Sequence, residues 1–266
     1  MTPIRIGAVS YLNSKPLIYG LSERPECSLR LDLPSRLSDG LLLGQFDVAL
    51  VPIVTLFDRP ELVIVSDACI ACRGPVWSVK LCSKVPVDRI RSLALDEGSR
   101  TSAILARILL RRRFGLNPAC QALPMDGDWQ SPSTDAVLVI GDRAIQNAAQ
   151  FPVVWDLGEE WHCEFGSPFV FAVWAARPEA KLAALSDCLS AARDAGLRML
   201  PAIADAECSE LGLSRERCLS YLRDNLHFRL GPAELRGLDR FYRLAVDAGL
   251  AADGWELNRY DCATVG

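Results

Sequence analysis

Histidine is nearly absent from this chain. Two of the 266 residues are histidines, His162 and His227, and they lie far apart in the sequence. A Ser-His-Asp or Cys-His hydrolase would have to use one of them. We interpret His162 as a structural residue ahead of a strand and His227 as a packed or surface residue of a helix. Gly-x-Ser-x-Gly and His-Glu-x-x-His motifs are also missing, so the sequence argues against a histidine-based hydrolase.

Nucleotide-binding loops, basic charge and long apolar runs are missing too. Neither Gly-x-Gly-x-x-Gly after a strand nor Gly-x-x-x-x-Gly-Lys-[Ser/Thr] occurs. The formal net charge is −4, which gives a nucleic acid no positive surface to bind. The longest apolar runs, such as 169–176, fall far short of the roughly 20 residues that a membrane span needs. The N-terminus does not read as a secretory signal. We therefore expect a cytoplasmic protein with no membrane or nucleic-acid partner.

Cysteine, in contrast, is abundant, with ten residues. Cys69 and Cys72 form the sole Cys-x-x-Cys pair, whereas a zinc site would need a second pair or two nearby histidines. The sequence from His162 to Glu164 resembles the His-x-Glu of zinc deaminases, but no Pro-Cys-x-x-Cys follows it. Because intracellular thiols stay reduced, we interpret the cysteines as mostly buried packing residues and predict no metal site.

The first fifty residues alternate between strands and helices. Strands are expected at 5–9, 29–33 and 47–51, and helices at 17–21 and 34–43. This β-α-β-α-β order favours a parallel sheet with right-handed crossovers. Further strands are expected at 62–66, 76–83, 90–95, 136–140, 153–155 and 169–175, and helices at 103–114, 141–144 and, with breaks, 179–250.

The helical tail follows an extended segment with no Gly/Ser linker, so it does not form a separate domain. We predict an α/β fold of two lobes, with a chain that crosses twice between them. Lobe one comprises 1–84 plus 177–266, and lobe two comprises 85–176. In such a fold the carboxyl ends of the strands face a central cleft, where ligands of open α/β sheets bind.

Polar loops that follow strands and precede helices supply the candidate site. The first contains Asn13, which has both a donor and an acceptor, and Ser14, which has a hydroxyl. The second, 96–102, places free N–H groups and hydroxyls at a helix start, which suits a carboxylate. The residues concerned are Ser99, Arg100, Thr101 and Ser102. In both loops the alternative is that these side chains only cap the following helix.

A third loop begins with Gly141, where a backbone N–H can approach a ligand closely. For Asp142 a helix cap is the favoured interpretation and ligand contact the alternative. Ser78 lies on or beside a strand that crosses between the lobes, so its hydroxyl can face the cleft. A lone serine on a strand is a weak signal by itself.

Seven segments occur in a characteristic order: GAVSYLNSKPL at 7–17, DVALVP at 47–52, SVKLCSKVP at 78–86, LDEGSRTS at 95–102, LVIGDRA at 138–144, DLGEEW at 156–161 and PFVFAVW at 168–174. Together they resemble the menaquinone-biosynthetic chorismate dehydratase family, the first enzymes of the futalosine route. The resemblance runs from residue 4 to about 178. Ser167 departs from it, because the family often has leucine there, and this change affects one cleft wall.

The resemblance implies a fold similar to type II periplasmic binding proteins, with two lobes around a central cleft. It implies a carbon-oxygen lyase (a hydro-lyase) that removes water from chorismate to give 3-[(1-carboxyvinyl)oxy]benzoate. No metal or organic cofactor is implied. The small-molecule substrate is then the expected partner, and the sequence does not determine the oligomeric state.

Site roles follow from the demands of that reaction. We expect Asn13 at the ring, beside the departing hydroxyl and the abstracted proton, as the catalytic residue. Ser99, Thr101 and Ser102 would bind one carboxylate, and Ser78 with the Gly141 N–H would contact the other end. Arg100 or Lys15 would help to attract the dianion. Because no histidine or buried carboxylate is available, the enolpyruvyl carboxylate of the substrate is the expected base.

Three alternatives remain open. The first is a non-catalytic small-carboxylate solute-binding protein of the same fold, which usually carries a secretion signal or lipid anchor. The second is the sensing domain of a transcription regulator, which would need a DNA-binding helix-turn-helix. The third is a related pathway enzyme that acts on a different cyclic acid.

Overall fold

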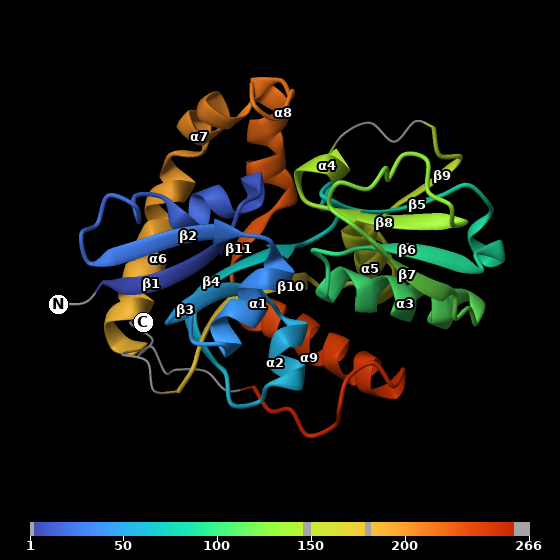
Figure 1. Cartoon of the computed structure of the whole chain (residues 1–266), viewed down its shortest axis with the longest axis horizontal. Coiled ribbons are helices and arrows are strands. Elements are labelled where there is room, and N and C mark those ends of the chain that lie inside the picture. The colour runs from blue at the N-terminus through green and yellow to red at the C-terminus, as the bar shows by residue number, and fades with distance from the viewer. Residues whose placement is uncertain (1–2, 146–149, 179–181, 258–266) are drawn as a thin grey trace.

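The computed structural model describes residues 3–145, 150–178 and 182–257. Over these ranges the chain forms two β-sheets with helices packed on their faces (Figure 1). The first sheet has the order β11-β4-β10-β3-β1-β2, and its strands are β1 (Ile4–Val9), β2 (Cys27–Asp32), β3 (Val48–Pro52), β4 (Val63–Cys72), β10 (Phe169–Ala176) and β11 (His227–Arg229). The second has the order β7-β6-β8-β5-β9, with β5 (Val79–Ser83), β6 (Ser92–Asp96), β7 (Ala119–Leu123), β8 (Ala136–Ile140) and β9 (Val153–Asp156).

We call the part of the chain around the first sheet the first lobe and the part around the second sheet the second lobe. The helices of the first lobe are η1 (Leu12–Ile18), α1 (Pro34–Leu42), α2 (Val54–Asp58), α6 (Leu182–Arg198), α7 (Leu200–Glu207), α8 (Arg215–Ser220), η3 (Tyr221–Asn225) and α9 (Pro232–Asp247). Those of the second lobe are η2 (Val87–Arg89), α3 (Thr101–Phe114), α4 (Asp142–Ile145) and α5 (Leu157–Phe165). The prediction of an α/β fold is confirmed.

Parallel pairing holds where the β-α-β-α-β pattern predicted it. β1 pairs in parallel with both β2 and β3. The helix boundaries follow local signals, because Pro34 opens α1 and Gly44, at φ +70°, follows its end. β10 then returns antiparallel between β3 and β4, which makes the first sheet mixed.

The two crossings between the lobes fall at 73–78, between β4 and β5, and at 166–168, between α5 and β10. The predicted division at 84 and 176 differs from this arrangement. β5, placed in lobe one by the prediction, pairs with β8 and β9 of the second sheet. β10, placed in lobe two, pairs with β3 and β4 of the first sheet. Both strands are buried apolar runs, and such runs carry no signal about which distant strand they pair with.

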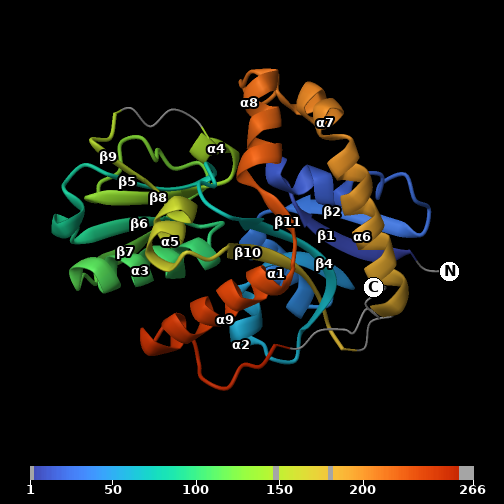
Figure 2. The same ribbon diagram turned by 180° about the vertical axis from the view of Figure 1, so that it is seen from behind.

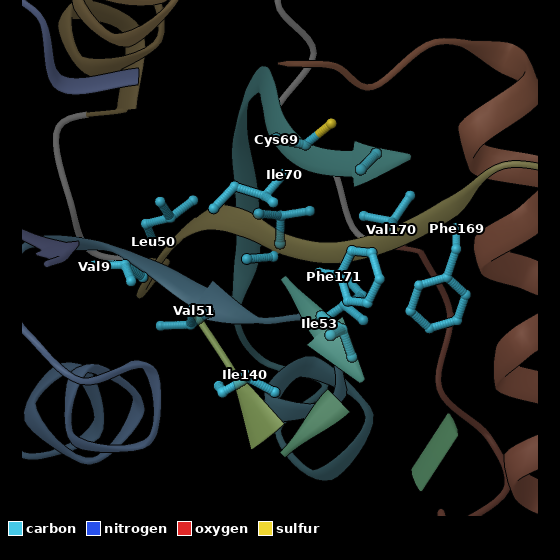
Figure 3. Packing of buried hydrophobic residues seen from close by; sticks show 14 of the residues in the cluster. Val9, Leu50, Val51, Ile53, Cys69, Ile70, Ile140, Phe169, Val170 and Phe171 are labelled. Carbon is cyan, nitrogen blue, oxygen red and sulfur yellow. The ribbon is translucent and has the colours of Figure 1, made fainter. Parts of the chain in front are cut away.

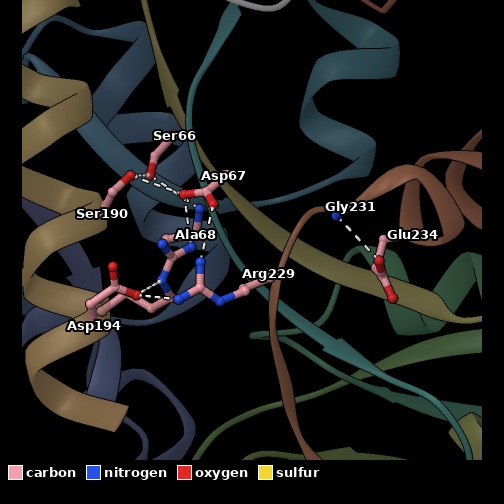
Figure 4. Close-up of polar contacts among 9 residues, drawn as sticks. Ser66, Asp67, Ala68, Ser190, Asp194, Arg229, Gly231 and Glu234 are labelled. Carbon is pink, nitrogen blue, oxygen red and sulfur yellow. Dashed lines mark hydrogen bonds and ion pairs between the residues drawn. The ribbon is translucent and has the colours of Figure 1, made fainter. Parts of the chain in front are cut away.

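The C-terminal part of the chain packs onto the first lobe. Asp67, at the middle of β4, accepts from Ser190 Oγ at 2.9 Å and pairs with buried Arg193 of α6 at 2.7 Å. Asp194 joins Arg193 to Arg229 of β11, at 2.8 and 2.6 Å (Figure 4). This network binds α6, β4 and β11 together. His227, predicted in a helix, lies in β11 because its backbone pairs with the edge of β4.

The core is continuous between the lobes. Figure 3 shows Ile53 beside Phe171 of β10, in a cluster that also contains Val51, Phe169 and Ile140 of β8. All five side chains are buried. Burial of a large apolar side chain contributes about 1.5–3 kcal/mol to folding. The same packing therefore stabilises the sheets and sets the distance between them.

The nine described cysteines are free thiols, and four of them are buried: Cys69, Cys72, Cys82 and Cys218. Cys120 and Cys163 are exposed, so the expectation of mostly buried cysteines is wrong, and Cys262 lies outside the described residues. Over the described ranges, no three His, Cys, Asp or Glu side chains gather as a metal site would require. In the same part of the chain, no helix has the length and apolar character needed to cross a membrane.

Candidate active site

A cleft lies between the two lobes and has a volume of about 510 Å³, including the space at its open mouth. The loops after β1, β6 and β8 meet there, as the strand order predicted. The lining residues are Val9, Tyr11, Asn13, Pro34, Pro52, Ile70, Val76, Ser78, Val79, Gly98, Ser99, Arg100, Thr101, Ser102, Ile140, Gly141, Phe171 and Ala172.

Seven of the nine predicted site residues line this cleft: Asn13, Ser78, Ser99, Arg100, Thr101, Ser102 and Gly141. They come from segments that are up to 128 positions apart in the sequence (141 − 13). The structure thus brings the predicted residues together, and their individual roles stay predictions.

Ser14 and Asp142 do not line the cleft. Ser14 is fully buried, and its hydroxyl donates to the carbonyls of Val9 and, at 2.9 Å, Tyr11, so it fixes the shape of its own loop. Asp142 accepts the Leu12 N–H at 3.0 Å and thereby joins α4 of the second lobe to η1 of the first. Its burial raises the pKa of its carboxyl to about 6. Both side chains are engaged by backbone groups in this structure, and their contact with substrate stays a prediction.

Three further contacts engage groups that were expected to bind or attract the substrate. The Gly141 N–H donates to the Ser78 carbonyl at 2.9 Å, so it is not free for a substrate. The Thr101 hydroxyl donates to the Phe171 carbonyl at 3.0 Å, which is a second tie between the lobes. Lys15 pairs with Glu207 at 2.8 Å and does not line the cleft.

Positive potential reaches the cleft from Arg100 and from α3. Arg100 lines the cleft and pairs with Asp39 of α1 at 2.8 Å, so its guanidinium bridges the two lobes. The 14 residues of α3 begin at Thr101. The first N–H groups of a helix have no partner within it and carry a partial positive charge. An anion at this end of the cleft would meet both groups.

Two buried polar atoms of the lining have no hydrogen-bond partner among the described residues: Asn13 Oδ1 and Ser99 Oγ. An unsatisfied buried polar group costs about 1–3 kcal/mol. A protein can carry this cost at a binding site, because a bound molecule then supplies the missing hydrogen-bond partner. These atoms lie on opposite lobes, and Ser99 Oγ is the one beside Arg100 and the start of α3.

The described lining contains no Asp, Glu, His, Lys or Cys side chain. Asp96 is buried close by, but it pairs with Arg143 at 2.6 Å and accepts the N–H groups of Gly98 and Ile140 at 3.0 and 3.1 Å. Its carboxylate is therefore fully engaged. The protein offers the cleft hydroxyls, an amide, a guanidinium and backbone N–H groups, which suit electrostatic stabilisation and orientation of an anion.

Sequence reasoning missed the apolar walls of the cleft. Tyr11 and Phe171 are the aromatic residues of the described lining, which also contains Ile70 and Pro52. Burial raises the pKa of the Tyr11 phenol, which stays protonated. Tyr11 lies within the first polar loop, so its position in the sequence could have marked it as a lining residue. Phe171 is one of a run of buried strand residues, and nothing in that run distinguishes it.

Comparisons with known proteins agree with this geometry. A family model described as menaquinone biosynthesis matches residues 4–247. The chorismate dehydratase of Thermus thermophilus is 32% identical over 261 residues, covering 91% of this chain and 94% of that protein.

Two solved structures share the fold. A protein of Archaeoglobus fulgidus superposes with a TM-score of 0.78 at 15% identity, covering 93% of this chain and 98% of its own. The periplasmic aliphatic sulphonate binding protein SsuA of Escherichia coli gives 0.64 at 15% identity, with 100% and 96% coverage. At such identities the likeness shows a fold like that of periplasmic binding proteins. The family model and the identity to the Thermus enzyme show more: this chain belongs to the menaquinone-biosynthesis family, as a homologue of chorismate dehydratase.

Proposed function

We propose that this protein is a hydro-lyase that removes water from chorismate to give 3-[(1-carboxyvinyl)oxy]benzoate, in the futalosine route to menaquinone. The observation that carries the proposal is the make-up of the cleft. Ser99 Oγ is buried and unpartnered beside Arg100 and the start of α3, and Asn13 lines the cleft from the other lobe. The named activity of the Thermus homologue supports the substrate.

The second lobe supplies the groups that bind one carboxylate of the dianion. One carboxylate lies at the N-terminus of α3, where Ser99 and Ser102 offer hydroxyls and Arg100 offers charge. The ring then lies against the apolar wall made by Tyr11 and Phe171. Ser78, which is buried in the crossing segment, contacts the opposite end of the substrate.

The chemical step breaks one C–H and one C–O bond. The ring proton on the carbon that bears the ether moves to the enolpyruvyl carboxylate of the substrate, because the described lining offers no base. The electron pair of that C–H bond forms the new ring double bond, and the hydroxyl leaves from the neighbouring carbon. The departing oxygen takes the proton that the carboxylate had abstracted and leaves as water, and the ring becomes aromatic. Asn13 hydrogen-bonds the departing hydroxyl.

Closure of the lobes holds the substrate in this geometry. Leu12 with Asp142, Arg100 with Asp39, and Thr101 with the Phe171 carbonyl join the lobes around the cleft. These contacts exclude water and keep the two reacting groups aligned. We further propose a cytoplasmic location, since a reducing compartment suits the free thiols of the nine described cysteines.

To test this proposal, the purified protein is mixed with chorismate and the loss of the diene absorbance is followed. The product is then identified by its mass. The proposal expects a product 18 mass units lighter than chorismate, about the mass of one water. Binding of chorismate without turnover would instead support the solute-binding alternative. Neither binding nor turnover would point to an enzyme of a different cyclic acid.

A further inference from the structure

Tyr221 places a phenol directly behind the cleft. It is the first residue of η3, where the helix that began as α8 widens into a π-helix. π-Helical turns are rare and often occur at functional sites. The side chain is fully buried, and its hydroxyl lies beside the side chains of Ser78 and Asn13.

The helix that carries Tyr221 is held at the junction of the lobes. Figures 1 and 2 both show α8 next to α4 of the second lobe. Arg217 of α8 donates to the Ile145 carbonyl of α4 at 3.2 Å. Asn225, at the end of η3, donates to the Pro75 carbonyl in the crossing segment at 2.9 Å. Tyr221 lies between these two attachments, so its position is fixed relative to both lobes.

The hydroxyl of Tyr221 has no satisfactory hydrogen bond within the described structure, and neither has Asn13 Oδ1. A buried phenol without a partner costs about 1–3 kcal/mol, which phenylalanine would avoid. Burial raises the pKa of the phenol, so it keeps its proton and can donate. A donor without an acceptor thus lies beside an acceptor without a donor.

We propose that Tyr221 is a positioning residue: its hydroxyl donates to Asn13 Oδ1 and accepts from Ser78 Oγ, so that the Asn13 Nδ2 group faces the substrate. The proposal rests on the proposed function for its kinetic consequence and on the arrangement of side chains for the rest. Tyr221 does not line the cleft, so it acts through Asn13 and Ser78.

The variant that tests this is Tyr221→Phe, which keeps the ring and removes the hydroxyl. Loss of one neutral hydrogen bond corresponds to a fall in kcat of about fivefold to tenfold, with KM within about twofold of wild type. In an Asn13→Ala background the same change should have no further effect, because the side chain that it orients is gone. Equal effects in both backgrounds would overturn the proposal.

Tyr242→Phe is the matched control. The Tyr242 hydroxyl donates to the Ala252 carbonyl at 3.0 Å and accepts the Trp255 N–H at 2.8 Å, away from the cleft. We expect this variant to lose thermal stability and keep kcat. Tyr221→Phe should show the reverse pattern. Loss of stability without a kinetic effect in Tyr221→Phe would show that the hydroxyl is merely structural.

A second readout does not depend on turnover. In a ¹⁵N-labelled full-length protein, the side-chain amide of Asn13 is assigned by its absence in Asn13→Ala. Tyr221→Phe should shift that resonance, since the acceptor of the amide group loses its donor. An unchanged resonance would overturn the inference even if the wild type dehydrates chorismate. A shifted resonance in a protein that leaves chorismate unchanged would retain the inference and contradict the proposed function.

Discussion

The ring of Tyr11, from the first lobe, lies directly over Gly141 of the second. A Cβ atom on Gly141 would be 2.7 Å from two atoms of that ring. The backbone of Gly141 also has φ +69°, in the region that favours glycine. The lobes therefore meet in the lining of the cleft at a point that has no room for a side chain.

Gly141→Ala should impair closure of the lobes. The added methyl group clashes with the Tyr11 ring, so we expect kcat/KM for chorismate to fall by about tenfold or more, which corresponds to about 1.4 kcal/mol. Steady-state kinetics checks this result. Retention of wild-type kcat/KM would show that the ring moves aside at no cost.

Gly115→Ala is the matched control for that variant. Gly115 has a similar φ of +67°, but nothing lies within 4 Å of the position that a Cβ atom would take there. We expect a loss of about 1 kcal/mol of unfolding free energy from backbone strain, with unchanged kinetics. The difference between the two variants then measures the clash alone.

Asn13→Ala should reduce kcat far more than it weakens binding. If Asn13 stabilises the departing hydroxyl, kcat falls by about 100-fold, as for other removed hydrogen-bond donors of this kind. The dissociation constant for chorismate, measured by calorimetry in the inactive variant, should change by less than about threefold. Near-normal turnover would remove Asn13 from the chemistry.

Arg100→Gln should act mainly on substrate capture. Arg100 is the charged side chain of the described lining, and chorismate is a dianion. We expect KM to rise by about tenfold and kcat/KM to depend less on ionic strength. Arg243→Gln, which removes an exposed partner of Asp239 on α9, is the control with unchanged kinetics. A fall in kcat alone would contradict a role in capture.

Asp142→Asn should change how stability depends on pH. The pKa of Asp142 is raised to about 6, so between about pH 4 and pH 6 the folded protein holds a proton that the unfolded chain has lost. The wild type therefore loses stability from this group as pH rises through that range, by up to about 3 kcal/mol. Asp142→Asn has no ionisable group at this position, so its free energy of unfolding should not fall for this reason.

Urea unfolding of both proteins at pH 4 and pH 7 measures the effect. The stability of Asp142→Asn relative to wild type should be greater at pH 7 than at pH 4. A difference that is the same at both pH values would show that Asp142 ionises alike in the folded and unfolded chains.

Local signals predicted most elements of the fold. The helix at 103–114 was expected to end at Gly115, and α3 does, because Gly115 adopts the left-handed conformation there. The buried strands at 136–140 and 169–175 were found within a residue of their ends. In contrast, β7 and β11 were missed, since β7 is mostly exposed, β11 has three residues, and both pair at the edge of a sheet.

The candidate site divides in the same way. Asn13, Ser99 and Gly141 could be located because each follows a strand in a polar loop. Phe171 and Tyr221 could not, because a buried aromatic residue looks the same in sequence whether it faces a core or a cleft. For Ser14 and Asp142 both a ligand contact and a structural contact were considered, because the sequence does not tell a polar group that binds a ligand from one that binds the backbone.

The sequence by itself determined the α/β class, the polar loops after the strands and the scarcity of histidine. These depend on residue type and on spacing between near neighbours. The tertiary structure decided which lobe holds β5 and β10, which hydroxyls stay unpartnered and how Tyr221 comes to lie behind Asn13. These depend on contacts between residues far apart in the chain, where hydrogen bonding and packing are settled only when both partners are in place.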